Sequence, residues 1–354
     1  MIKKKEKKKF KRRNIKLQNI NLDNLDSFDE TEIVEESRSD KKIVEKAKSS
    51  SKSNLKLVEG RVLEVKSNHA CQVKFGDEKR ECILGGRLKQ LNFETRTLVA
   101  VGDYVNVDLA EEARIEEILP RRNNLSRFSE ENFQKEIIIA ANIDQVIITV
   151  SVKEPDLNFG LIDRYLCAGR IANIDTIVCV NKIDLCADFA ALSRKLDFYR
   201  NNGIKVIMTS TESGTGMTEL KEILKNQESV FSGHSGVGKS SLINYLQPEL
   251  LLRVSEVSDF TNKGIHTTTS ARLLEWDFGG YLVDTPGIKT FGLHREDKDK
   301  IYRIFPGIDV LSVDCKFDDC SHTHEQDCAV KTAIEEGEFP LERYESYLRI
   351  IESL

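Results

Sequence analysis

Residues 55–119 alternate apolar and polar positions in short segments separated by glycine-containing turns. The alternation is clear at 71–75, and again at 105–109, where Asn106 and Asp108 separate apolar neighbours. A period of two places successive side chains on opposite faces of a strand. Several short strands with turn signals between them are typical of a small barrel. The pattern therefore predicts a five-stranded OB-like β-barrel.

From Ile137 onward the pattern becomes that of an α/β protein. Gln145–Val150 is a nearly continuous β-branched run, a helical stretch covers Leu161–Ala172, and a second apolar run follows at Thr176–Val180. Further short apolar runs at 206–208 and 281–283 suit additional strands. Strands that are apolar throughout and alternate with helices are typical of a parallel sheet covered on both faces.

After Leu293 the chain becomes irregular and rich in cysteine. It ends in an amphipathic helix that follows Pro340, with Leu341, Tyr344, Leu348 and Ile351 on one face. The pattern as a whole predicts four parts: a disordered charged extension at 1–52, the barrel at 53–120, an α/β nucleotide-binding domain at 121–293 and a cysteine-rich helical domain at 294–354.

Composition agrees with a globular protein. The chain has 354 residues, of which 40% are apolar, and this length suits two or three domains. It contains no run of about 18 apolar residues, so we expect no transmembrane helix. The amino terminus lacks the apolar segment of a signal peptide. We therefore expect a cytoplasmic protein with reduced thiols and no membrane partner.

The net charge of −5 hides a basic amino terminus. Residues 1–13 carry nine Lys/Arg and one Glu, so the rest of the chain is acidic. This distribution does not favour a reader of duplex DNA, although local patches and the basic arm suit RNA. Two interpretations of the arm stay open. It is either a solvated tail or a segment that binds phosphates by displacing counterions.

The strongest chemical signal is a phosphate-binding loop. Residues 233–240 match G-x-x-x-x-G-K-[ST] in full, between a short apolar strand and a predicted helix. Glycines let backbone N–H groups close around phosphate oxygens, and the helix amino terminus attracts the same charge. Lys239 is expected to reach the β- and γ-phosphates and Ser240 to hold Mg²⁺. The predicted nucleotide-binding set here is Gly233, His234, Ser235, Gly236, Val237, Gly238, Lys239, Ser240 and Ser241.

A second motif predicts the base. Asn181-Lys182-Ile183-Asp184 follows a strand directly. An aspartate there can accept from N1–H and N2–H of guanine, a donor pair that adenine lacks, so Asp184 predicts guanine selectivity. We expect Asn181 to contact the far edge of the base and the Lys182 stem to cover its face. Thr209 and Ser210, which follow the next strand, can support this contact.

A third motif supplies the remaining catalytic candidates. Asp284-Thr285-Pro286-Gly287 follows an apolar strand. Asp284 can hold Mg²⁺ through water, and the Gly287 amide can bind the γ-phosphate. Between the two phosphate motifs lie His266 and three threonines at 267–269, one of which can complete the Mg²⁺ shell.

The motif order indicates a circular permutation. In Ras-like GTPases the phosphate loop comes first and the guanine motif near the end, whereas here the guanine motif precedes the phosphate loop. The same sheet can result because domain termini usually lie close together at the surface.

Three cysteines crowd into residues 315–328. Cys315, Cys320, His322 and Cys328 offer three thiolates and one imidazole, a closed tetrahedral set for one structural Zn²⁺. His324 competes as the fourth ligand, and free thiols are the alternative to metal.

These motifs together resemble the ribosome small-subunit-dependent GTPase A family. The resemblance covers about 55–354 and rests on the motif order, on Gly102–Val105, on Pro120–Arg122 and on the terminal Cys₃His set. It implies an N-terminal OB domain, a circularly permuted P-loop GTPase domain and a C-terminal zinc domain. It also implies a GTPase that acts in late maturation of the 30S subunit, with 30S and its rRNA as partners. We expect a monomer.

Two other functions stay open. One is a GTP-dependent RNA-binding assembly switch that does not hydrolyse GTP, and the other is a GTPase that serves the large subunit. Ile288 stands where Ras-like enzymes place the glutamine that orients water. We therefore expect slow intrinsic turnover, with His266 or a ribosomal group assisting catalysis.

Overall fold

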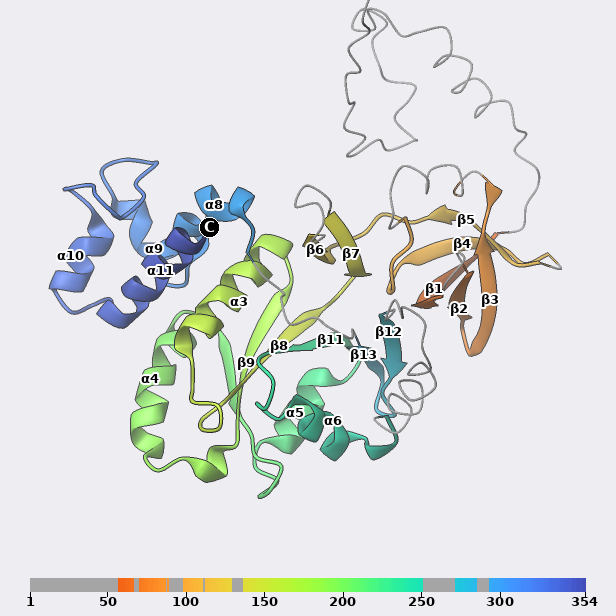
Figure 1. Ribbon diagram of the computed structural model, residues 1–354, viewed down its shortest axis with the longest axis horizontal. Coiled ribbons are helices and arrows are strands. Elements are labelled where there is room, and N and C mark those ends of the chain that lie inside the picture. Colours follow the sequence, from red (N-terminus) through yellow and green to blue (C-terminus); the bar gives the residue numbers. More distant parts are fainter. Residues whose placement is uncertain are drawn as a thin grey trace, which may run out of the picture. The chain divides into compact units, whose positions relative to one another are not determined.

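The computed structural model of the chain describes residues 57–66, 70–86, 88, 98–110, 112–128, 136–250, 271–284 and 293–354 (Figure 1). The predicted extension at 1–52 lies outside these residues, and the domain boundaries given above remain predictions. No helix in the described part of the chain is long and apolar enough to cross a membrane.

The first described segment is a closed five-stranded barrel. Its strands are β1 (Leu57–Val65), β2 (Ala70–Phe75), β3 (Glu78–Leu84), β4 (Tyr104–Asp108) and β5 (Arg114–Ile118). They follow the order β1-β2-β3-β5-β4, and β4 returns to pair with β1. Inward-facing residues from all five strands, among them Val62, Val73 and Ile115, are fully buried. The predicted OB-like barrel is confirmed.

A bidentate ion pair ties the segment after the barrel back to it. Arg121 donates from Nε to Asp103 Oδ1 at 2.6 Å and from Nη2 to Oδ2 at 2.7 Å, and Asp103 is fully buried. The chain then forms a two-stranded sheet, β6 (Asn124–Phe128) and β7 (Glu136–Ala141). The apolar periodicity did not predict this sheet.

A mainly parallel sheet carries the nucleotide motifs. Its order is β10-β9-β8-β11-β13-β12, with only β12 antiparallel, and β12 also pairs with β1 of the barrel. The strands are β8 (Gln145–Ser151), β9 (Asp175–Asn181), β10 (Lys205–Met208), β11 (Gln227–Ser232), β12 (Arg272–Glu275) and β13 (Gly280–Asp284).

Alternate residues of β8 face two separate cores. Val146, Ile148 and Val150 pack against α3 and α4, whereas Ile147 packs against α5 and α6. Because both faces are covered, every residue of β8 is buried, which accounts for its continuous apolar run. The four helices are α3 (Phe159–Ala172), α4 (Phe189–Asn201), α5 (Met217–Leu224) and α6 (Lys239–Leu246).

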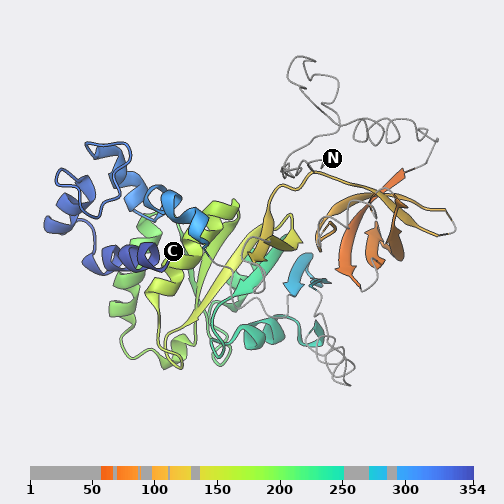
Figure 2. The same ribbon diagram turned by 45° about the horizontal axis from the view of Figure 1, so that its top comes forward.

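The C-terminal segment is helical and continues the first of these cores. Ile301, Phe305 and Tyr347 belong to the same buried cluster as Ile162 and Leu166 of α3. Both views place α8 and α11 beside α3 (Figures 1 and 2). The helices are α8 (Lys298–Ile304), α9 (Ile308–Leu311), α10 (Ala329–Glu335) and α11 (Leu341–Ser353).

Candidate functional site

Strand β11 leads directly into the phosphate loop, and α6 begins at Lys239. Two glycines are required by their surroundings. Gly233 has φ +149°, and a Cβ there would lie 2.0 Å from the Thr149 carbonyl oxygen. Gly238 has φ +92°, and a Cβ there would lie 2.3 Å from Asn181 Nδ2. The loop therefore takes its shape only with glycine at these positions.

The Lys239 ammonium group lies over the loop. It donates to the carbonyl oxygens of Gly233 at 2.8 Å and His234 at 2.7 Å. Partial burial lowers the pKa of Lys239. Ser240, in the first turn of α6, is exposed and accessible to a ligand. Val237 is buried, whereas His234, Ser235 and Gly236 are exposed.

Asn181 connects the guanine motif to the phosphate loop. Its Nδ2 donates to the Val237 carbonyl oxygen at 3.0 Å, and its Oδ1 accepts from Thr209 Oγ1 at 3.1 Å. The Asn181 side chain is buried and both ends of its carboxamide are bonded. In this structure Asn181 therefore positions the backbone of the phosphate loop. Its contact with the far edge of the base stays a prediction.

The other two polar members of the guanine motif lie closer to solvent. Asp184, in the exposed 3₁₀ turn Ile183–Leu185, accepts a short hydrogen bond from Ser210 Oγ. Lys182 adopts a left-handed conformation, φ +58°, and its Nζ donates to the Glu154 carbonyl oxygen. The structure thus brings Ser210 to Asp184 and Thr209 to Asn181. The prediction that Thr209 and Ser210 lie beside the guanine motif agrees with these contacts, and their support of a base contact stays a prediction.

Asp284 ends β13, next to β11. Because β11 and β13 are parallel, Asp284 and the phosphate loop lie at the same edge of the sheet. Burial raises the pKa of the Asp284 carboxyl, and the charge of Arg272 opposes that shift. The other catalytic candidates, Gly287 and His266, lie outside the described residues, as do the threonines at 267–269.

The cysteine-rich segment brings four potential ligands together. The ligand atoms of Cys315, Cys320, His322 and Cys328 all lie within 4.8 Å of one another. His322 Nδ1 lies 3.5 Å from Cys315 Sγ and 3.4 Å from Cys328 Sγ. The three cysteines are free of disulfides, and this spacing fits a metal ion with ligand bonds of about 2.3 Å.

The two histidines that compete as the fourth metal ligand differ in burial, and only His322 lies in the cluster. His322 is fully buried and has φ +58°. His324 leaves 84% of its side chain exposed and lies beside Glu325.

Helix α11 supports the backbone that carries the ligands. Tyr344 Oη donates to the His322 carbonyl oxygen at 2.7 Å, and Tyr347 Oη donates to that of Ser321 at 2.6 Å.

Sequence reasoning missed the buried contacts that join these parts. Arg343 of α11 donates to Asp163 Oδ2 of α3 at 2.8 Å, and Glu228 of β11 pairs with Arg61 of the barrel. Asp163 had one visible signal, an acid inside the apolar stretch of a helix. Glu228 had none, because its partner lies 167 positions away in the chain.

Comparison with known proteins agrees with this geometry. The RsgA GTPase family model matches residues 118–294. The small ribosomal subunit biogenesis GTPase RsgA of Flavobacterium psychrophilum is 38% identical over 280 residues, which cover 77% of this chain and 86% of that protein. The protein of the same name from Chlorobaculum parvum is 41% identical over 273 residues, covering 74% of this chain and 87% of its own.

Two solved structures share the fold. YjeQ from Thermotoga maritima superposes with a TM-score of 0.67 at 32% identity, covering 84% of this chain and 98% of its own. YloQ, described as a circularly permuted GTPase, gives a TM-score of 0.63 at 27% identity, covering 84% of this chain and 94% of its own. The predicted circular permutation is confirmed.

Proposed function

This chain belongs to the RsgA GTPase family, and we propose that it hydrolyses GTP to GDP and phosphate on the small ribosomal subunit during late maturation of that subunit. The observation that carries the proposal is the Asn181–Val237 hydrogen bond, which joins a guanine motif to a phosphate loop in one site. The relatives' name, small ribosomal subunit biogenesis GTPase, supplies the partner. No observation favours a switch without hydrolysis or a role on the large subunit.

The reaction is in-line attack of water on the γ-phosphate, catalysed by positioning and charge neutralisation. Lys239 is the proposed cation for the β- and γ-phosphates. Ser240 and Asp284 are the proposed holders of Mg²⁺, because a hydroxyl and a carboxylate are the oxygen ligands that this ion prefers. When bound, Mg²⁺ neutralises charge on the phosphate oxygens. Gly287 is the proposed amide donor to the γ-phosphate, and His266 remains the proposed group that orients water.

Base selection is assigned to Asp184. Its carboxylate is exposed, and the hydroxyl of Ser210 fixes it by a hydrogen bond. A carboxylate that is already oriented loses little freedom when it accepts from the guanine edge. Lys182, bonded to the Glu154 carbonyl, is the proposed cover for one face of the base.

The Cys₃His cluster is the proposed site of one structural Zn²⁺. All four protein ligands come from residues 315–328 and they leave no open coordination position, which suits a structural ion. Cys320 and Cys328 are buried, and buried ligands exclude the water that a catalytic zinc needs. We also propose a cytoplasmic monomer that binds 30S and its rRNA, and the small-subunit name of the relatives supports the ribosomal partner.

GTP turnover by the purified chain, measured alone, with 30S subunits and with 50S subunits, tests the proposed function. We expect slow basal turnover and stimulation by 30S only. The Lys239→Ala variant is the matched control, because it removes the phosphate cation from an otherwise intact chain and should abolish both rates. Stimulation by 50S instead would assign the large subunit. GTP binding with no turnover in any arm would favour the switch.

A further inference from the structure

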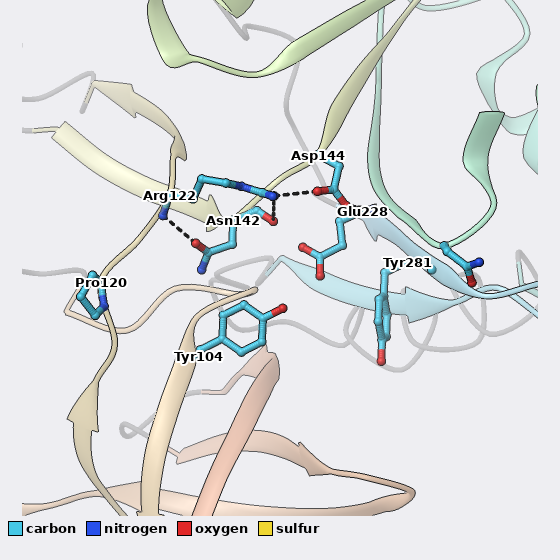
Figure 3. A pocket seen from close by; sticks show the side chains of 9 residues that line it. Tyr104, Pro120, Arg122, Asn142, Asp144, Glu228 and Tyr281 are labelled. Carbon is cyan, nitrogen blue, oxygen red and sulfur yellow. Dashed lines mark hydrogen bonds and ion pairs between the residues drawn. The ribbon is translucent and has the colours of Figure 1, made fainter.

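A hollow lies where the barrel meets the parallel sheet (Figure 3). It has a volume of about 510 Å³, in the range of small-molecule pockets. The parallel strands β11 and β13 begin at the edge of the sheet that lines this hollow, whereas the phosphate loop follows the other end of β11. Among the described residues that line the hollow are Tyr104, Arg122, Asp144, Glu228 and Tyr281.

Two tyrosine rings and two carboxylates, those of Asp144 and Glu228, line this hollow (Figure 3). Tyr104 begins β4 of the barrel. It is one of the large, partly apolar side chains that stay exposed, at 40%. Tyr281 lies on β13 of the GTPase sheet and Glu228 on β11. The barrel and the sheet thus each contribute an aromatic ring to the same cavity.

The Tyr104 ring is held in place by a cation over one of its faces. The Arg61 guanidinium lies 4.0 Å from the ring centroid, and Arg61 is itself buried and paired with Glu228. One face of the ring is therefore occupied by a fixed cation, while 40% of the residue stays exposed. A platform that is ordered in advance binds a planar ligand at a lower entropic cost.

The polar wall of the cavity is fixed too. Asp144 Oδ2 accepts from the Glu228 backbone N–H at 2.7 Å, and Asp144 Oδ1 accepts from Arg122 Nη2 at 2.6 Å. Arg61 donates to Oε2 of Glu228, so Oε1 of Glu228 is the carboxylate oxygen left for a ligand. The wall therefore offers an acceptor beside two aromatic surfaces.

We propose that this cavity binds an unstacked nucleobase of single-stranded RNA, which stacks on Tyr104 or Tyr281 and donates its exocyclic amino group to Glu228. Single-stranded RNA is usually recognised by stacking splayed bases on aromatic rings and bonding their edges. Free phosphate and nucleotide phosphates fit less well, because Arg122, the arginine that lines the described wall, is already paired with Asp144. The inference rests on the proposed function in one respect: rRNA of the small subunit would supply the base.

The test measures binding of fluorescent single-base RNA hexamers to the full chain, with nucleoside monophosphates in a parallel arm. Tyr104→Leu and Tyr281→Leu remove the stacking surfaces and keep apolar volume. Tyr245→Leu is the matched control, because Tyr245 is 50% exposed and lies on α6 outside the cavity. Basal and 30S-stimulated GTP turnover are recorded for each variant.

We expect the variant of the ring that carries the base, Tyr104→Leu or Tyr281→Leu, to weaken hexamer binding about ten-fold or more, the usual effect of losing one stacked base. The salt dependence should be unchanged, since no phosphate contact is lost. Adenine, cytosine and guanine hexamers should bind better than uracil hexamers, and Glu228→Gln should reduce that preference, because an amide can also donate to a uracil carbonyl. Basal turnover should match that of the unmodified chain.

Two results would overturn the proposal. One is equal hexamer affinity in Tyr104→Leu, Tyr281→Leu and the control. The other is tighter binding of nucleoside monophosphates than of hexamers, which would make the site one for a free nucleotide. Because 30S stimulation is measured on the same preparations, failure of the proposed function shows separately as lost stimulation in the unmodified chain.

Discussion

Asn181 Nδ2 donates to the carbonyl oxygen of Val237 at 3.0 Å, so the residue that opens the guanine motif holds the backbone of the phosphate loop. Loss of this bond leaves a buried carbonyl without its partner, at a cost of about 1–3 kcal/mol. We expect Asn181→Ala to weaken the binding of GTP and GDP by the fold-change that this free energy corresponds to. The substitution should also slow turnover. Titration with a fluorescent guanine nucleotide measures this. Unchanged affinity for both nucleotides would remove Asn181 from its positioning role.

Asp184 should control base identity without affecting the loop. Asp184→Asn replaces an acceptor by a side chain that can also donate, so GTP binding should weaken and xanthosine triphosphate binding should improve. Competition between the two nucleotides measures the change. Ser210→Ala is the companion variant, because it removes only the hydroxyl that bonds Asp184 and should lower GTP affinity without favouring xanthosine. If Asp184→Asn prefers GTP as the parent does, base recognition lies elsewhere.

Local sequence was enough to predict the parts of the site whose geometry is local. The phosphate loop depends on Gly233 and Gly238, and the positions of both follow from a short motif. Contacts such as Arg61 with Glu228 could not be predicted, because they depend on how β1 packs beside β11. The sequence predicted His322 as the fourth ligand and left His324 as a competitor, because ligand spacing alone allows both; the coordinates place His322 in the cluster and His324 outside it.

The two histidines make a matched pair for the metal site. We expect His322→Ala to lose bound zinc, because the cluster then keeps only three ligand atoms. We expect His324→Ala to keep it, because that side chain is 84% exposed and outside the cluster. Metal content by mass spectrometry, together with thermal unfolding, distinguishes them. Zinc loss in His324→Ala with retention in His322→Ala would reverse the assignment.

Glu228 should give the fold a specific pH dependence. Burial raises its pKa from 4.5 to about 7, helped by Asp144 and opposed by Arg61 and Arg122. Between those values the unfolded chain releases a proton that the folded chain retains. The contribution of Glu228 to the free energy of unfolding therefore falls as pH rises across this window, by up to about 3 kcal/mol.

Urea unfolding of the parent chain and of Glu228→Gln at about pH 5 and about pH 7.5 measures this effect, because the other groups cancel in the difference. The parent should lose stability relative to Glu228→Gln as pH rises. A relative gain would mean that the Arg61 ion pair outweighs burial and keeps the carboxylate ionised.

A buried polar cluster joins α11 to the GTPase domain. Asp163 is fully buried, accepts from Arg343 Nη1 at 2.8 Å and accepts from Tyr199 Oη at 2.8 Å. Arg343 also donates to Tyr199 Oη at 2.7 Å, so three helices meet in one polar cluster. Burial raises the pKa of the Asp163 carboxyl, and the Arg343 charge is the main opposing effect.

Arg343→Met should therefore destabilise the chain by about 3–5 kcal/mol, because it leaves a buried carboxylate without its cation. Asp163→Asn combined with Arg343→Met removes both charges and keeps a hydrogen-bonding side chain for Tyr199. The double variant should be more stable than Arg343→Met alone, and urea unfolding of the four chains of this cycle gives the coupling energy. If the two substitutions add without coupling, the pair does not hold α11 against α3. The C-terminal helices would then depend on apolar contacts such as those of Phe305 and Tyr347.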